Sequence, residues 1–194
     1  MNVLVTGSRG QLGKFLTNIQ SEDIEFIGSA RNLTPNETGR LIEIDITDEE
    51  GLVRAISEIS PEYVVNTAAL TNVDACERDP SMAQLANAIA PRNIASACLL
   101  ANAKMIQIST DYVFDGEVGM YSETDEVCPI QEYGRTKLLG ERNVIDVLGS
   151  DVCILRTSVV FDGASNNFVK WIIDSLVDGS EIRIVEDQWV CPTS

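Results

Sequence analysis

Short runs of β-branched and aliphatic residues alternate along the chain with longer segments whose apolar residues recur at helical spacing. The short runs predict strands at Asn2–Val5, Ile24–Ile27, Leu41–Ile44, Tyr63–Asn66, Met105–Ser109, Val152–Leu155 and Ile182–Val185. The longer segments predict helices at Gln11–Ile19, after Thr47, from Pro80 to about Asn102, through the stretch YGRTKLLGE at 133–141, and at Asn167–Val177. Because nearly unbroken apolar strands alternate with helices, the pattern predicts an α/β fold, a doubly wound parallel sheet with helices on both faces.

Three of the predicted helices begin at recognisable signals. Thr47 with Glu50 three residues later reads as a capping box. Asp79 and Pro80 offer an N-cap and a proline at the first helical position. Pro129 is expected to open the helix that carries YGRTKLLGE. Each of these starts follows a predicted strand.

Length and net charge narrow the class of protein. The 194 residues suffice for one sizeable core. A formal net charge of −16 repels phosphate backbones, which argues against nucleic acid as a partner. An anionic cofactor can bind only where backbone dipoles or a few basic side chains outweigh this field.

The composition excludes several kinds of site. The chain has no histidine, which removes Ser-His-Asp and Cys-His catalysis and histidine metal sites. Its five cysteines are scattered without a CxxC pair, so we expect no disulfide framework, no structural metal site and a cytoplasmic location. MNVLVTG runs straight into strand-like sequence and the apolar stretches are short, so we expect neither a leader peptide nor a membrane partner.

The segment VTGSRGQLG places Gly7, Gly10 and Gly13 between the first predicted strand and the first predicted helix. This GxxGxxG spacing is a variant of the dinucleotide fingerprint, whose glycines allow a tight turn, close backbone approach to pyrophosphate and helix–strand packing. The amides that begin the Gln11 helix would face the anion. A turn that is glycine-rich by chance is the alternative. The position after an N-terminal strand in an alternating chain favours the dinucleotide site of a Rossmann fold.

The end of the second strand bears on the choice of dinucleotide. A carboxylate there would bind the ribose 2′-hydroxyl of NAD, but the strand ends in GSARN, with Arg31 close behind. An arginine can pair with a 2′-phosphate, so NADP(H) is favoured and NAD(H) is possible. A solvated loop arginine would give the same pattern.

Ligands of open parallel sheets bind beyond the carboxyl ends of the strands. Besides the glycine loop, those ends carry Asp45–Ile46, Thr67–Leu70 and Ser109–Tyr112, the last within STDYVFDG. The two hydroxyls of Ser109 and Thr110 stand at the tip of the fifth strand. A polar strand end is the structural alternative to a substrate-binding role.

Tyr133 and Lys137 are four residues apart and share one face of their predicted helix. A structural alternative pairs Lys137 with Glu141, in the weaker orientation and worth only a few tenths of a kcal/mol. In the catalytic interpretation, an ammonium group lowers the tyrosine pKa of ~10 by roughly 1–3 units. Tyr133 could then deliver a proton to a carbonyl oxygen as hydride arrives at its carbon, with Thr110 holding that oxygen.

Six segments together resemble the extended short-chain dehydrogenase/reductase superfamily and, within it, the dTDP-4-dehydrorhamnose reductase family. They are TGSRGQLG, NTAALTNVDACERD, STDYVFDG, YGRTKLLGE, RTSVVF and EDQWVCPTS. The resemblance implies NAD(P)H-dependent reduction of the 4-keto group of a nucleotide-linked deoxysugar. It implies Tyr133 as proton donor, Lys137 as its activator and nicotinamide-ribose ligand, and Thr110 as partner of the substrate oxygen. It further implies cofactor contacts from Gly10, Gln11, Leu12, Asp45, Ile46, Ala68, Ala69 and Leu70, and sugar contacts from Asp111 and Tyr112.

Two departures from the family pattern matter. Val159 stands in RTSVV where the family often has a sugar-contacting tryptophan, which weakens the rhamnose-precursor assignment. Family members also continue well beyond PT. We therefore expect residues 1–160 to form the NAD(P)-binding domain and residues 161–194 to begin a substrate-binding region that is only partly present. The resemblance also implies a homodimer.

Two other functions fit the same motifs. The resemblance extends to the regulatory subunit of methionine adenosyltransferase, which has this fold and binds NADP(H) without turnover. Epimerisation or dehydration of a sugar nucleotide is also open, because Asp111 stands beside Thr110. Intact Thr110, Tyr133 and Lys137 favour the reductase.

Overall fold

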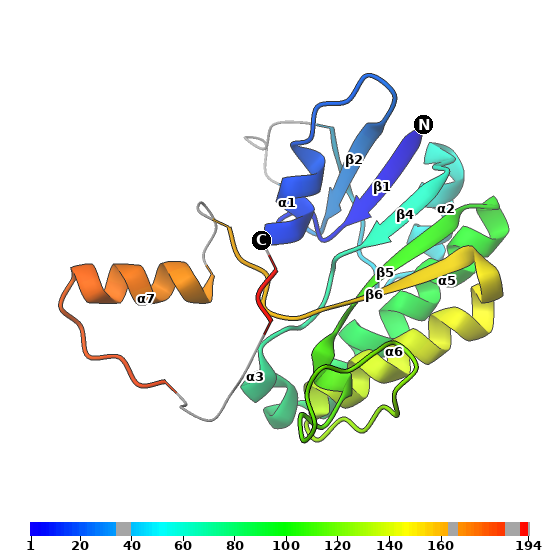
Figure 1. The fold of residues 1–194 in the computed structure, drawn as a ribbon. Helices are drawn as coiled ribbons and strands as arrows, with labels where there is room; N and C mark the ends of the chain where they lie inside the picture. The colour runs from blue at the N-terminus through cyan, green and yellow to red at the C-terminus, as the bar shows by residue number, and fades with distance from the viewer. Residues whose placement is uncertain (34–39, 163–166, 185–190, 194) are drawn as a thin grey trace. The chain divides into compact units, whose positions relative to one another are not determined.

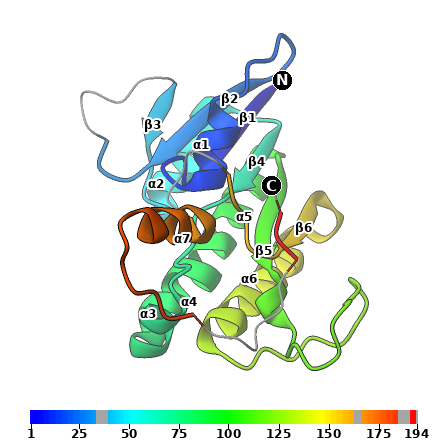
Figure 2. The same ribbon diagram turned by 60° about the vertical axis from the view of Figure 1, so that its left-hand side comes forward.

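The computed structural model describes residues 1–33, 40–162, 167–184 and 191–193. Its strands are β1 (Asn2–Thr6), β2 (Glu25–Ala30), β3 (Leu41–Glu43), β4 (Tyr63–Asn66), β5 (Lys104–Thr110) and β6 (Val152–Thr157). They form one sheet in the order β3-β2-β1-β4-β5-β6 (Figures 1 and 2). The pairs from β3 through β5 are parallel, which confirms the predicted α/β sheet.

Helices connect the strands. They are α1 (Gln11–Thr17), α2 (Glu49–Ile59), α3 (Val73–Arg78), α4 (Pro80–Gln84), α5 (Ala90–Ala101), α6 (Glu132–Leu148) and α7 (Phe168–Val177). A π-helical turn, η1 (Leu85–Ile89), joins α4 to α5, and short 3-10 turns stand at η2 (Asp111–Val113) and η3 (Gly149–Asp151). The predicted helix from Pro80 therefore exists, but a π turn interrupts it.

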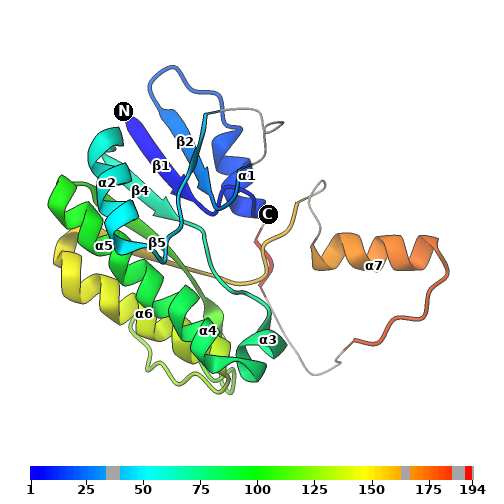
Figure 3. The same cartoon turned by 180° about the vertical axis from the view of Figure 1, so that it is seen from behind.

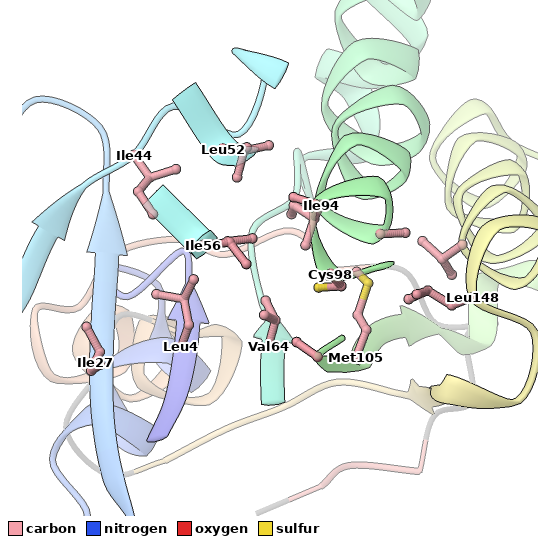
Figure 4. Packing of buried hydrophobic residues seen from close by; sticks show 14 residues of the cluster. Leu4, Ile27, Ile44, Leu52, Ile56, Val64, Ile94, Cys98, Met105 and Leu148 are labelled. Atoms are coloured by element: carbon pink, nitrogen blue, oxygen red, sulfur yellow. The ribbon is translucent and has the colours of Figure 1, made fainter. Parts of the chain in front are cut away.

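Apolar residues of the central strands face two cores. Leu4 packs with Ile27 and Val64 into the larger cluster, to which α2, α5 and α6 contribute Ile56, Ile94 and other residues (Figures 3 and 4). Val3, Val5 and Val65 face the other side, where Leu16 of α1 packs against them. Both faces of these strands are covered, which is why the strands read as continuous apolar runs.

Several predicted boundaries are wrong in detail. The N-cap of α2 is Asp48, whose carboxylate accepts from Gly51 N at 3.1 Å, and Thr47 instead donates its amide and hydroxyl to Asp45. Helix α6 begins at Glu132 instead of Pro129, because Glu77 of α3 accepts from the Glu132 amide at 2.7 Å.

The predicted strand at Ile182–Val185 is absent from the described residues. Residues 182–184 are not in a strand, and Val185 lies outside the described residues. Helix α3 has no counterpart among the predicted elements. Asn72 caps it by accepting from Ala75 N at 2.7 Å.

The chain divides into two compact units, Met1–Arg156 and Thr157–Ser194. The first holds the sheet and the helices α1 to α6. The second contains α7, capped by Asn167 through Lys170 N, and a parallel bridge between Val160 and Thr193. Over the described ranges, no helix has the length and apolarity needed to cross a membrane.

Candidate active site

The strand register brings several predicted site segments to one edge of the sheet. Thr6 lies opposite Ser29 and Asn66, and Asn66 lies opposite Gln107. Strand β5 then continues to Thr110, beyond the end of β4. The glycine loop, the segment after Asn66 and the tip of β5 therefore share the carboxyl edge of the sheet, where parallel sheets bind ligands.

A buried row of hydrogen-bonded polar side chains crosses β1, β4 and β5 next to this edge. Thr6 Oγ1 donates to Asn66 Oδ1 at 2.6 Å, and Asn66 Nδ2 donates to Gln107 Oε1 at 2.8 Å. The amide of Ala68 donates to the same Asn66 Oδ1 at 3.2 Å. Because these groups satisfy one another away from water, they fix the start of the Ala68–Leu70 segment relative to β1 and β5.

The glycine loop has the shape of a dinucleotide cradle. Gly7 has φ +73°, and a Cβ there would lie 2.7 Å from Ala68 N. A Cβ at Gly13 would lie 2.4 Å from Gly7 O. Gly10 caps α1 in an extended conformation with no side-chain hydrogen bond, and Gln11 Nε2 is buried with no partner in the described part of the chain. These residues fit a pyrophosphate, because they leave close backbone access and a free donor.

The end of β2 gathers charge from three segments. Arg31 lies near Asp45, whose pKa is lowered by hydrogen bonds from Thr47, the backbone amide first, and by the Arg31 guanidinium. Arg9, from the glycine loop, donates to the carbonyls of Arg31 and Asn32, both at 2.9 Å. Sequence reasoning missed Arg9, although its place inside GSRG was a signal. Leu12 and Ile46, two further predicted cofactor residues, are half-buried.

Tyr133 and Thr110 lie together at the tip of β5. Burial raises the pKa of Tyr133 to about 12, and its hydrogen bond with Thr110 acts in the opposite direction. The Tyr133 ring also meets the Tyr112 ring edge-on, with centroids 5.7 Å apart. Gly134 permits this approach, since a Cβ there would lie 2.1 Å from Tyr112 O. The glycine in YGRTK therefore has a packing role.

Lys137 is buried one turn further along α6. Its Nζ donates to the carbonyl of Ile108 in β5 at 2.6 Å. Burial lowers the pKa of Lys137 to about 8, against the negative charge of Glu141, which raises it. A buried ammonium with one carbonyl partner is costly and is typical of a functional group.

The pKa of Tyr133 is raised in this structure and not lowered, and Lys137 is not among the causes of the shift. Desolvation dominates at both residues: it raises the pKa of Tyr133 and lowers that of Lys137. The surface pairing of Lys137 with Glu141 does not describe the structure either. Glu141 is buried, and its ion pair is formed with Arg156.

Asn87, in the π turn η1, is a second residue that sequence reasoning missed. Its Oδ1 accepts from Leu70 N at 2.8 Å, and its Nδ2 donates to Leu70 O at 3.0 Å and to Thr136 Oγ1 at 3.2 Å. The side chain thereby joins the Ala68–Leu70 segment to α6. Since π turns are common at functional sites, the interruption of the helix is itself informative.

The predicted sugar-contacting residues are divided between the two units of the chain. Asp111 Oδ1 accepts from Thr110 Oγ1 at 3.3 Å, and Tyr112 N donates to the same hydroxyl at 3.2 Å, so both lie beside Thr110. Val159 belongs to the second unit, where its carbonyl accepts from Thr193 N at 2.8 Å. Within the described ranges, no three acidic or cysteine side chains gather into a possible metal site.

Comparisons with known proteins agree with this arrangement. Residues 1–194 match the family described as the RmlD substrate binding domain. A probable low-salt glycan biosynthesis reductase of Haloferax volcanii is 38% identical over 100% of this chain and 66% of its own length. The crystal structure of a dTDP-4-dehydrorhamnose reductase from Clostridium acetobutylicum is 37% identical, with a TM-score of 0.83 over 97% of this chain and 64% of that one.

A solved relative also holds a cofactor. The dTDP-4-dehydrorhamnose reductase of Bacillus anthracis, in complex with NADP, is 35% identical, with a TM-score of 0.80 over 89% of this chain and 59% of that one. The chain thus spans between 59% and 66% of the length of these relatives.

Proposed function

Because the chain belongs to the RmlD substrate binding domain family, we propose that it carries the catalytic and cofactor-binding residues of an NAD(P)H-dependent reductase. The substrate is the 4-keto group of a nucleotide-linked deoxysugar, in a reaction of the dTDP-4-dehydrorhamnose to dTDP-rhamnose type. The observation that carries the proposal is the meeting of Thr110, Tyr133 and the buried Lys137 at one edge of the sheet. That edge also carries the glycine loop.

The cofactor is NADP(H) by preference, with NAD(H) possible. Gly7, Gly10 and Gly13 would hold the pyrophosphate, with Gln11 Nε2 as a free donor and Leu12 beside it. Arg31, braced by Arg9 through its carbonyl, would pair with a 2′-phosphate. Asp45–Ile46 and Ala68–Leu70 would line the nucleoside side of the site. The NADP complex of the Bacillus anthracis relative supports this assignment.

The reaction needs one proton at the substrate oxygen. When bound, the reduced nicotinamide supplies the hydride that adds to the keto carbon. Thr110 donates a hydrogen bond to the keto oxygen, and Tyr133 Oη donates its proton to the same oxygen. A pKa of about 12 keeps that proton on Tyr133 until negative charge develops on the oxygen, which is then the stronger base. Lys137 would stabilise the phenolate that Tyr133 becomes and would hold the nicotinamide ribose when the cofactor is bound.

The sugar would lie against Asp111 and Tyr112, which stand beside Thr110. Val159 would be a further sugar contact. Residues 1–160 would form the NAD(P)-binding domain, and residues 161–194 would begin the substrate-binding region. A homodimer in the cytoplasm is the proposed state of the whole protein, and size-exclusion chromatography with light scattering tests the dimer.

The decisive test is a coupled assay of the full-length protein with dTDP-4-keto-6-deoxy sugars and each reduced nicotinamide. We expect NAD(P)H to be consumed in proportion to the sugar. Tyr133→Phe should lower kcat by about 100-fold or more and leave the dissociation constant of NADPH nearly unchanged, because only the proton is removed. Undiminished activity of Tyr133→Phe, or no turnover with any 4-keto nucleotide sugar, would overturn the proposal.

The same assay separates the alternatives. A regulatory subunit would bind NADPH without consuming it and would alter the activity of a partner enzyme. An epimerase or dehydratase would convert the sugar without net loss of NAD(P)H, and the acid beside Thr110 makes Asp111 its residue to test.

A further inference from the structure

Glu141 stands at the centre of a buried polar cluster behind the candidate active site. It lies on α6, one helical turn after Lys137, and its side chain is 4% exposed. Ser109 Oγ donates to Glu141 Oε1. Arg156, from β6, donates Nε to Oε1 at 3.0 Å and Nη2 to Oε2 at 2.7 Å. The fork of the guanidinium thus matches both carboxylate oxygens.

The other face of Arg156 meets the loop that follows β5. Its guanidinium carbon lies 5.2 Å from the centroid of the Phe114 ring, the geometry of a cation–π contact. Phe114 stacks in turn on Tyr121, with ring centroids 4.4 Å apart and planes 6° apart. Tyr121 Oη donates to the carboxylate of Asp115 and accepts from Val118 N. We call residues 111–125 the site loop.

Arg156 therefore contacts α6 and the site loop directly, and it is linked to the end of β5 through Glu141. Its ion pair with Glu141 fixes α6 one turn after Lys137. Glu141 also accepts from Ser109, the residue directly before Thr110, and so fixes the end of β5. Through Phe114, Arg156 acts on the site loop, which contains Asp111 and Tyr112. The arrangement favours arginine, because a lysine ammonium lacks the planar fork that can donate two parallel N–H bonds to the carboxylate while its flat face stacks on the ring.

We propose that Arg156 and Glu141 are positioning residues, which hold Lys137, Thr110 and the site loop in the geometry that reduction of the keto group needs. The inference rests on the proposed function for its effect on turnover, and its effect on the site loop is independent of that function. Neither residue touches the substrate oxygen in this role. Each acts through the residues that it holds.

The charge of Glu141 adds an electrostatic consequence. It raises the pKa of Lys137 against the effect of burial, so Glu141→Gln should lower that pKa further and let Lys137 lose its proton at lower pH. The other titratable or charged groups around this part of α6 include Glu132 and Tyr133 on the helix itself, Asp111, Tyr112 and Glu123 after β5, Cys76 and Glu77 on α3, and Arg156 on β6.

The test compares Arg156→Lys and Glu141→Gln with Arg142→Lys in the full-length protein. Arg142 lies on the exposed side of α6, next to Glu141, and provides the same change of residue without the buried partner. We expect Arg156→Lys to lower kcat by about tenfold to a hundredfold while the dissociation constant of NADPH changes by less than about threefold. For Glu141→Gln, the alkaline limb of the kcat profile should move to lower pH. Arg142→Lys should match the wild type in both measurements.

Hydrogen exchange provides a measurement that needs no turnover. In Arg156→Lys, the amides of Phe114, Glu117 and Val118, which are bonded within the site loop, should exchange about tenfold faster or more. The core amides of β1 and α2 should exchange at the wild-type rate. An inactive wild type together with faster exchange would refute the proposed function and support the positioning role.

Three results would overturn the inference. One is a kcat for Arg156→Lys and Glu141→Gln equal to that of Arg142→Lys. The second is unchanged exchange in the site loop. The third is a loss of activity that disappears when it is corrected for the folded fraction, since that would show a purely structural ion pair.

Discussion

Replacing Lys137 by methionine should make the protein more stable while it removes activity. The ammonium is buried, and its pKa is lowered from 10.5 to about 8. That shift of about 2.5 units corresponds to about 3 kcal/mol of unfavourable free energy for the charged form at neutral pH. Methionine has a similar shape and carries no charge. It removes one of two donors to the Ile108 carbonyl, which keeps Gln107 Nε2 at 2.8 Å, so the lost hydrogen bond costs only about 1 kcal/mol.

The net gain in stability at pH 7 is therefore expected to be about 2 kcal/mol, and the pH dependence is the sharper measurement. Because the folded-state pKa of Lys137 is lowered, the unfolded chain binds more protons between about pH 8 and pH 10.5. The free energy of unfolding of the wild type should then rise relative to that of Lys137→Met by about 1 kcal/mol between pH 7 and pH 9.

Urea denaturation at several pH values provides the assay, and Lys104→Met is the matched control. Lys104 is exposed at the start of β5, away from the candidate site. Its replacement should leave the pH dependence of the wild type intact. Parallel unfolding profiles for the wild type and Lys137→Met would show that the buried ammonium does not carry this cost, and the reasoning would then be wrong.

Three further predictions concern the cofactor. Arg31→Ala should weaken NADPH binding by about tenfold and leave NADH binding unchanged, because only NADPH carries the 2′-phosphate; equal effects on both dissociation constants would refute this pairing. Gly7→Ala and Gly116→Ala, with φ +73° and +83°, should each lose about 1–2 kcal/mol of stability from the backbone conformation. Gly7→Ala should lose more stability and should also weaken NADPH binding, because its Cβ would lie 2.7 Å from Ala68 N, whereas a Cβ at Gly116 meets no atom within 4 Å. Asn87→Ala should cost about 1–3 kcal/mol in urea denaturation and raise the dissociation constant of NADPH, and wild-type binding would contradict the link from Asn87 to Leu70.

The sheet could be predicted from sequence because each central strand is buried on both faces. Leu4 faces one cluster and Val3 and Val5 face the other, so consecutive residues of the strand are all apolar, which is the pattern of a buried parallel strand. The parallel register then placed Gly7, Thr67 and Thr110 at one edge, which made the candidate site foreseeable in outline.

Helix starts and electrostatics were less predictable, because tertiary contacts decide them. Glu77 on α3 accepts from the first amide of α6, and no local pattern around Pro129 contains that partner. The Tyr133 pKa likewise depends on burial, which the spacing of tyrosine and lysine does not reveal. The role of Arg156 in RTSVVF could not be predicted, because its partners Glu141 and Phe114 are distant in sequence.

The π turn at η1 determines which side chains of α4 and α5 point in the same direction around their common axis. Such a turn holds one residue more than an α-helical turn, and each helical residue rotates the chain by about 100°. Removing one residue between Leu85 and Ile89 would let α4 and α5 continue as one regular α-helix. If Ile94 and Cys98 then kept their places in the core, Asp79 and Asn87 would be rotated by about 100° around the helix axis. The extra residue therefore lets Asn87 face Leu70 and Thr136 while Ile94 and Cys98 face the core, which a regular α-helix would not allow.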